Sequence, residues 1–425
     1  MELEGKGQPP TGVLEFVRRN YAWVVVGVTF LALLVAAGVR SIPGVFMLPM
    51  ESELGWDRSS ISLAVAVSLL AFGFGAPLAG GYIDRHGPRR VMIAGLTLIA
   101  AGLAPMIWMS ALWQLFVLWG IVVGVGTGAV ANVLGASVAG RWFVKSRGIV
   151  VGLFAAASSA GQLIFLPLMM AVTVAAGWRT SVAILAVTAA VMILPTLLLM
   201  RDRPSDVGLR PYGDDGATAS PAAAAERGTP LSAAIRTKDF WFLAGSFFVC
   251  GYTSNGLVGT HLIPHAIEHG FTQVAAASAV ALMGSMNVVG TLASGWLTDR
   301  YDNRKLLAAY YGFRALSIAA LPFIFEMQGL LIFAVVYGLD WIATVPPTVN
   351  LTANRFGRAS IGTLYGWIFC AHMIGASLAA YAGGFFRTML GDYHLIFISA
   401  AVLGIIAVGL AMSISPARKS RPAAA

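Results

Sequence analysis

Long apolar runs separated by short polar segments extend along the whole chain. Most runs hold about 20 or more residues rich in Ala, Leu, Val and Gly, and a bilayer-spanning α-helix needs about 20 apolar residues. The runs are too long for strands, and only helices or closed barrels cross a membrane. We therefore predict an all-α membrane protein. The twelve predicted spans cover residues 22–48, 60–81, 91–110, 113–139, 148–172, 180–200, 240–266, 273–297, 306–325, 329–352, 361–385 and 394–414.

One polar loop of the chain occurs twice. The tract 80–90 follows the second apolar run, and a similar tract, 295–305, follows the eighth run 215 positions later. The same offset maps Glu53 onto Glu268, so the repeat extends well beyond the loop. The loop residues predicted to act in conformational change are Gly80, Asp84, Arg85 and Arg89 in the first copy and Gly295, Asp299, Arg300 and Arg304 in the second.

The duplication predicts two related six-helix bundles. Residues 1–200 would form the first and residues 239–425 the second. The segment 201–238 between them is polar and contains four prolines, so we expect it to be a linker on one side of the membrane.

Composition and charge fit this topology. The chain is 58% hydrophobic and 11% charged, whereas a soluble domain has about 25% charged residues. Most of the 28 Lys and Arg residues lie in alternate loops, and only Arg58, Arg179 and Arg387 lie in the others. Because basic loops stay in the cytoplasm, we predict an inner-membrane protein with both termini cytoplasmic.

The same distribution explains the net charge of +9 without nucleic acid, since the charge is spread over short loops. The two cysteines lie in separate spans, so neither a disulfide framework nor a metal cluster is implied. No nucleophile–base pair or cofactor motif is present. We expect no enzyme activity, no cofactor and no metal.

The duplicated G-x-x-x-D-R-x-G-x-R-R loop and the twelve spans resemble the major facilitator superfamily. Within it, the tracts Arg40-Ser41-Ile42-Pro43-Gly44-Val45-Phe46 and Glu53-Leu54-Gly55-Trp56 are similar to those of the monocarboxylate transporters and oxalate–formate antiporters. This resemblance implies a monomeric carrier whose two bundles rock around a central path lined by spans 1, 4, 7 and 10. The Asp in the repeated loop would bias the bundles towards one closed state.

The chain departs from that branch at its basic residues. Thr291 stands in span 8 where an arginine is expected, and span 4 lacks the arginine common in proton-linked members. In span 11, where the exchanger carries a lysine, the basic side chain is His372. A dicarboxylate held by two cations is therefore disfavoured.

Arg40 is the principal candidate for substrate binding. It lies within span 1, its guanidinium can hold a carboxylate through two hydrogen bonds, and Asn255 occupies the equivalent position in the second copy. A structural arginine paired with a helix carbonyl is the alternative.

Asp340, within span 10, has three interpretations. Burial favours its neutral form, which makes it a candidate proton carrier. It could instead be a partner of Arg40 that substrate releases, or part of a permanent ion pair. His261 and His265 have a spacing that can bind metal, but no third ligand accompanies them. The other predicted substrate contacts are His261, Asn132, Asn287, Tyr337 and Trp341.

Together these features predict a secondary transporter of small organic monoanions, coupled to protons and working by alternating access. The partners would be the anion, the proton and the lipid bilayer. Two alternatives remain at this point. The protein could export apolar or cationic compounds with Asp340 as the counter-charge, or it could be a non-transporting sensor on the same fold.

Overall fold

The computed structural model describes residues 20–144, 146–213, 229–357 and 361–416, and this part of the chain is almost entirely helical. No β-strand forms within these ranges. Phe143 and Tyr212 make an isolated parallel bridge, which ties the start of the linker to the first bundle.

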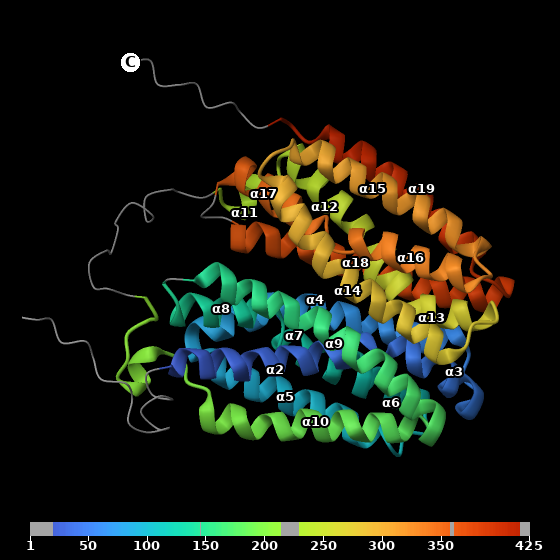
Figure 1. The fold of residues 1–425 in the computed structure, drawn as a ribbon, viewed down its shortest axis with the longest axis horizontal. Coiled ribbons are helices and arrows are strands. Elements are labelled where there is room, and N and C mark those ends of the chain that lie inside the picture. The colour runs from blue at the N-terminus through green and yellow to red at the C-terminus, as the bar shows by residue number, and fades with distance from the viewer. Residues whose placement is uncertain (1–19, 145, 214–228, 358–360, 417–425) are drawn as a thin grey trace, which may run out of the picture.

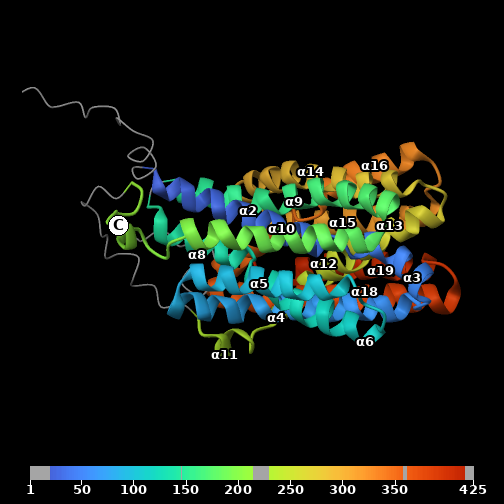
Figure 2. The ribbon, with the colours of Figure 1, turned by 90° about the horizontal axis from the view of Figure 1, so that it is seen from below.

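The helices form two bundles that pack side by side along the long axis of the molecule (Figures 1 and 2). The first bundle contains α2 (Tyr21–Ser41), α3 (Pro43–Leu54), α4 (Arg58–His86), α5 (Pro88–Met106), α6 (Leu112–Leu115), η1 (Phe116–Val123), α7 (Gly124–Ala129), α8 (Asn132–Trp142), α9 (Arg147–Ala176) and α10 (Trp178–Leu199). The second contains α12 (Lys238–Gly251), η4 (Tyr252–Val258), α13 (Gly259–Glu268), α14 (Gln273–Thr298), α15 (Asn303–Ala320), η5 (Leu321–Phe323), α16 (Met327–Asp340), α17 (Val345–Phe356), α18 (Ile361–Leu390) and α19 (His394–Ser413). The short helices η2 (Pro204–Val207) and α11 (Leu231–Ala234) lie between the bundles in sequence.

Eleven helical stretches among the described residues are long and apolar enough to cross a membrane. The remaining predicted span, 240–266, is divided among α12, η4 and α13. The predicted fold class, an all-α protein of two related helical bundles, is confirmed. The end of the molecule that carries η2 and α11 is called the linker end below, and the end that carries α3 and α13 is called the far end.

Four of the twelve predicted spans are interrupted, and they are the first, fourth, seventh and tenth. Ile42 separates α2 from α3, and the segment 341–344 separates α16 from α17. The fourth and seventh spans contain the π-helical segments η1 and η4. Each of the other eight spans is formed mainly by one α-helix, and the ninth ends in the short 3-10 helix η5. Prolines cause two of the breaks, because Pro43 and the pair at 346–347 cannot donate backbone hydrogen bonds.

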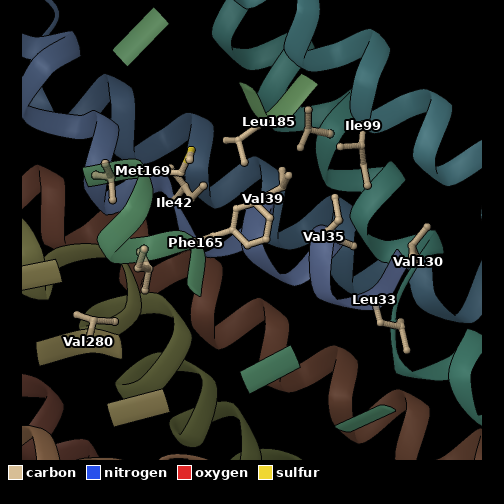
Figure 3. Close-up of a cluster of buried hydrophobic side chains, with 14 of the residues drawn as sticks. Leu33, Val35, Val39, Ile42, Ile99, Val130, Phe165, Met169, Leu185 and Val280 are labelled. Atoms are coloured by element: carbon tan, nitrogen blue, oxygen red, sulfur yellow. The ribbon is translucent and has the colours of Figure 1, made fainter. Parts of the chain in front are cut away.

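The apolar core holds these broken helices in place. Figure 3 shows Phe165 of α9 beside Val39 of α2. A Cβ atom at Gly38 would lie 2.5 Å from a ring carbon of Phe165, so the missing side chain lets α9 pack closely on α2. This packing fixes the end of α2 at the interface between the bundles.

Candidate functional site

A small cavity lies between the two bundles at the level of the helix breaks. Its volume is about 40 Å³, which is room for about three water molecules. The first bundle contributes Arg40, Ser41, Pro43, Val65, Leu69, Gln162 and Leu166, and the second contributes Asn255, Gly259, Thr260, Val280 and Trp341. The cavity thus brings together three predicted site residues, Arg40, Asn255 and Trp341, and none of its lining residues is acidic.

Arg40 lies in the last turn of α2, directly before the break. Its guanidinium carbon lies 5.0 Å from the centre of the Phe72 ring, in a cation–π contact. Neither an ion pair nor a hydrogen bond from the Arg40 side chain to another described residue is formed. Arg40 is half-buried, and a guanidinium without a protein partner can hold an anion that enters the cavity.

Asn255 reaches the cavity from the π-helical segment η4. A π-turn inserts an extra residue into the helix and leaves local backbone groups without their usual partners. The hydroxyl of Thr260 donates to the carbonyl oxygen of Asn255, at 3.2 Å, and so satisfies one of them. The Asn255 side chain contacts a ring nitrogen of His372, with 3.3 Å between Nδ2 and Nε2.

Trp341 lies in the break that follows α16 and is 3% exposed. Its indole N–H is buried and has no acceptor among the described residues. Buried donors are rarely left without a partner in folded proteins. Two residues that line the cavity, Arg40 and Trp341, therefore carry N–H groups that no described group satisfies.

Asp340 lies one residue before Trp341, and its partner is Arg314 of α15 rather than Arg40. Arg314 Nε donates to Asp340 Oδ2 at 2.8 Å. The same side chain donates to the carbonyl oxygens of Asp340 at 2.5 Å and of Trp341 at 2.9 Å. These carbonyls lie at the C-terminal end of α16, where the regular helical hydrogen bonds stop; the carbonyl of Asp340 also accepts from the backbone N–H of Ala343 at 3.3 Å. Arg314 therefore satisfies both the carboxylate and the broken helix end.

The Arg314 contacts extend to α12 in the same bundle. Arg314 Nη1 lies 3.0 Å from the sulfur of Cys250, and Thr344 Oγ1 lies 3.1 Å from the same sulfur. Asp340 Oδ1 is buried and has no described partner. The cluster is thus almost fully bonded, and its one unsatisfied acceptor is on the predicted proton-coupling residue.

Three other predicted substrate contacts are buried outside the cavity lining. Asn287 Oδ1 accepts from the backbone N–H of Ile342 at 3.1 Å. Tyr337 donates its hydroxyl to the carbonyl oxygen of Thr253 at 2.7 Å. His261 Nε2 lies 2.7 Å from the carbonyl oxygen of Ala380. Each of these side chains bonds to backbone, and two of them bond to backbone at or beside a helix break.

The described side chains of the repeated loops make contacts within their own bundles at the linker end. Arg89 donates to the carbonyl oxygen of Leu197 at 2.6 Å, and Arg304 donates to that of Ile414 at 3.1 Å. Both acceptors are at the C-terminal ends of helices, where a cation is favoured. Hydrogen bonds from Arg304 lower the pKa of Asp302. The two copies of the loop thus keep equivalent helix contacts.

The remaining loop predictions differ in their surroundings. Arg85 lines a hollow of about 330 Å³ at the linker end, and Gly80 packs near Val133. Asp299 and Arg300 are exposed, and a Cβ atom added at Gly295 would have no described atom of another element within 4 Å. The side chains of Asp84 and Asn132, both named as site residues, lie outside the described part of the structure.

The far end joins the two bundles through Arg58, which is 3% exposed. Arg58 pairs with Glu51 of its own bundle and with Glu268 of the other bundle at 2.8 Å. It also donates to the hydroxyl of Tyr393 at 2.7 Å; burial raises the pKa of that hydroxyl to about 12, so it stays neutral. Arg387 pairs with Glu268 at 2.9 Å. This end of the molecule is therefore tied closed.

Hydrogen bonds between the bundles are otherwise few. Asn287 donates to Ser159 at 3.3 Å near the middle of the molecule, and the backbone of Ser59 donates to Thr388 at 3.2 Å at the far end. Between described residues, no hydrogen bond crosses from one bundle to the other at the linker end. The contacts between the bundles thus differ strongly at their two ends.

Sequence analysis did not identify Arg314 or Arg58 as functional or structural centres. Arg314 could have been suspected as an ionisable residue inside a span. Arg58 was counted as a loop charge, and no local signal marks its two partners in the other bundle, Glu268 and Tyr393, which lie more than 200 residues away. Among the described residues, no group of His, Cys, Asp and Glu is arranged to hold a metal ion.

Comparison with known protein families gives an extensive match. The family model described as Major Facilitator Superfamily matches residues 29–380. Over 406 residues the chain is 26% identical to a protein of Bacillus subtilis named uncharacterized MFS-type transporter YcxA, covering 91% of this chain and 93% of that one. It is 23% identical to the oxalate:formate antiporter of Oxalobacter formigenes, covering 94% and 93%. It is 22% identical to monocarboxylate transporter 13 of Bos taurus, covering 96% and 91%.

Solved structures share the fold at low sequence identity. The D-xylose-proton symporter superposes with a TM-score of 0.75 at 14% identity, covering 94% of this chain and 99% of that chain. An inward-facing, unoccupied bacterial homolog of the human lysosomal transporter Spinster superposes with a TM-score of 0.72 at 15% identity, covering 92% and 96%.

Proposed function

This chain belongs to the Major Facilitator Superfamily of membrane transporters, and we propose that it carries small organic monoanions, together with protons, across the plasma membrane by alternating access. One observation carries the proposal: the guanidinium of Arg40 lies at a cavity between the bundles without a described partner. The similarity to an oxalate:formate antiporter and to a monocarboxylate transporter supports the same substrate class.

The chemistry of the cavity suits a monoanion with an apolar part. Arg40 supplies a fixed positive charge that can hold a carboxylate through two parallel hydrogen bonds. The indole N–H of Trp341 offers a further donor, and Val65, Leu69 and Val280 supply apolar wall. A second cation that would compensate a dianion is not among the lining residues, and an acid that would hold a cation is not among them either.

The cavity has to widen before it accepts such a ligand. Its volume of about 40 Å³ corresponds to about three waters, and the far end is tied closed by Arg58. We propose that rocking of the bundles opens the site alternately to the two sides. The linker end would face the cytoplasm, as the distribution of basic loops predicts, and one chain supplies the whole site, which suits a monomer.

Asp340 is our proposed proton-coupling residue. Its Oδ2 and its backbone carbonyl are held by Arg314, while Oδ1 is buried without a described partner. A proton can bind at Oδ1 without displacing these Arg314 bonds. The residue adjoins Trp341, which lines the cavity, so a change of charge on Asp340 lies close to the bound anion.

The test is uptake of radiolabelled lactate and pyruvate into proteoliposomes, with and without an inward proton gradient. We expect gradient-stimulated accumulation by the wild type and at least about a 100-fold loss in Arg40→Ala, since two charge-assisted hydrogen bonds are lost. Arg236→Ala is the matched control, because Arg236 is exposed and lies outside the cavity lining.

The proposal fails if Arg40→Ala transports the acids as the wild type does. Accumulation of a lipophilic cation, with none of the acids, would indicate an exporter of cationic compounds. No movement of either class would favour a sensor.

A further inference from the structure

His372 is a buried titratable side chain with no role in the transport scheme described so far. It lies on α18, is 6% exposed, and is close to Asn255 across the interface between α18 and η4. The close approach depends on Gly251 and Gly256, where an added Cβ would lie 1.8 Å from the carbonyl oxygen of His372 and 2.3 Å from that of Ala376. The two helices are thus packed tightly enough to fix the side-chain contact.

His372 is linked to the cavity by two routes. The polar route is its contact with Asn255, which lines the cavity. The aromatic route runs from the His372 ring to Phe369, stacked at 5.5 Å, then to Phe72 at 6.4 Å, over which Arg40 lies. The second route crosses from one bundle to the other.

We infer that His372 is a proton-dependent switch of anion affinity and that the carboxamide of Asn255 transmits its state to the cavity. This inference rests on the proposed anion site at Arg40. It assigns the pH dependence of binding to a residue that does not itself line the cavity.

The chemistry of the contact gives the switch its direction. When neutral His372 carries its proton on Nδ1, Nε2 accepts from the Asn255 amide N–H, which leaves the amide oxygen as the end available to the cavity. A protonated imidazole donates from Nε2 and requires the amide oxygen as its partner. The carboxamide then turns by half a rotation and offers its N–H₂ group to the cavity. The two ends of a carboxamide have almost the same shape, so this rotation hardly changes the packing.

Both consequences of protonation favour an anion. An amide oxygen facing the cavity repels a carboxylate, whereas an amide N–H donates to it. The positive charge on the imidazolium also lies near the bound anion and attracts it. By linkage, a proton that strengthens anion binding is itself bound more tightly when the anion is present, so the two are favoured to cross together.

The groups around His372 do not hold it in one charge state. The thiol of Cys250 on α12 lies close enough to interact directly with His372, and Arg314 and then Asp340 lie behind that thiol. Phe247 and Phe369 cover the ring faces, and Asn255 occupies the side towards the cavity. The other ring nitrogen, Nδ1, is buried without a hydrogen-bond partner. No described carboxylate is in direct contact with His372, so its charge is not locked by an ion pair.

The experiment measures equilibrium binding of radiolabelled lactate to the purified full chain at pH 5.5 and pH 8. Lactate stays ionised across this range, so a change in affinity reports on the protein. We expect the wild type to bind about tenfold more tightly at pH 5.5, which is the effect of roughly one charge-assisted hydrogen bond. The ratio of the lactate affinities at pH 5.5 and pH 8 should fall to about one in two variants. These are His372→Phe, which keeps the ring stack, and Asn255→Leu, which keeps the side-chain size.

The double variant should behave as either single variant does, because both changes remove one interaction. A thermal unfolding midpoint in detergent that is close to that of the wild type shows that the variants are folded. If the variants keep the tenfold ratio while Arg40→Ala does not bind lactate, the switch is overturned and the anion site stands. A wild-type ratio of one also overturns the switch. No lactate binding by the wild type at either pH overturns the anion site and the switch together.

Discussion

Two arginines lie inside the membrane-spanning part of this protein, and their surroundings are opposite. Arg314 is fully buried within the second bundle and bonds to a carboxylate, two backbone carbonyls and a thiol. Arg40 lies at the cavity between the bundles with the ring of Phe72 as its described contact. The first is charge-balanced by the protein, and the second has no counter-charge among the described residues.

The difference shows that a charged residue inside a span can be either structural or functional. Its bonding partners have to be known before one of the two roles is assigned. Desolvating an ion is expensive, and the cost is offset only by good pairing. Arg314 meets that requirement inside its own bundle, at the end of a broken helix. Arg40 does not, which makes it the stronger candidate for binding an anion that enters and leaves.

The largest loss of stability should come from replacing Arg314, the arginine that is paired with Asp340. Arg314→Met leaves Asp340 buried without its cation, so we expect the free energy of unfolding to fall by about 3–5 kcal/mol. The double variant Arg314→Met/Asp340→Leu removes both charges and should recover most of that loss. Arg40→Met should change stability by less than about 1 kcal/mol, because it removes one cation–π contact and no described ion pair. Thermal unfolding in detergent measures all three, and similar losses for the two single Arg variants would contradict the comparison.

A smaller effect is expected when only the proton site is changed. Asp340→Asn keeps an oxygen that can accept from Arg314 but removes the titratable carboxyl. We expect anion exchange across the membrane to continue in this variant, while accumulation driven by a proton gradient falls about tenfold or more. The two assays are run on the same proteoliposomes. Gradient-driven accumulation at the wild-type level would remove Asp340 from the coupling mechanism.

Sequence patterns predicted the fold and part of the site for clear physical reasons. Apolar length determines the spans, and the duplicated tract identifies equivalent positions, which is how Arg40 led to Asn255. The structure places both residues, with Trp341, at one cavity. Helix breaks in spans 1, 7 and 10 account for this, because each of the three residues lies at or beside one of these breaks.

The partners of polar residues could not be predicted in the same way. Asn287 and Tyr337 were expected to contact substrate, but their side chains bond to the backbone of Ile342 and Thr253. Broken helices create unsatisfied backbone groups, and nearby polar side chains satisfy them. Which side chain does so depends on how the helices are rotated and packed, and apolar runs hold little information about that rotation. The pairing of Asp340 with Arg314 likewise depends on how α15 and α16 are rotated and packed.

Arg58 extends the comparison with a third kind of arginine. It is as fully paired as Arg314, but Glu268 and Tyr393 belong to the other bundle. Alternating access requires these bonds to break whenever the far end opens, so they stabilise one conformation rather than the fold. The symmetry of the chain offers a control, because Glu53 is the repeat counterpart of Glu268 and pairs with Arg179 of its own bundle.

We therefore expect Glu268→Gln to shift the equilibrium towards opening of the far end by about tenfold, the effect of weakening a charge-assisted hydrogen bond. Glu53→Gln should leave that equilibrium almost unchanged. Distances between spin labels placed on α3 and α13 would report the populations. Equal shifts in the two variants would mean that the far end is held by packing alone. A shift confined to Glu268→Gln would show that the same residue type, at equivalent positions of the repeat, maintains the fold in one copy and controls the transport cycle in the other.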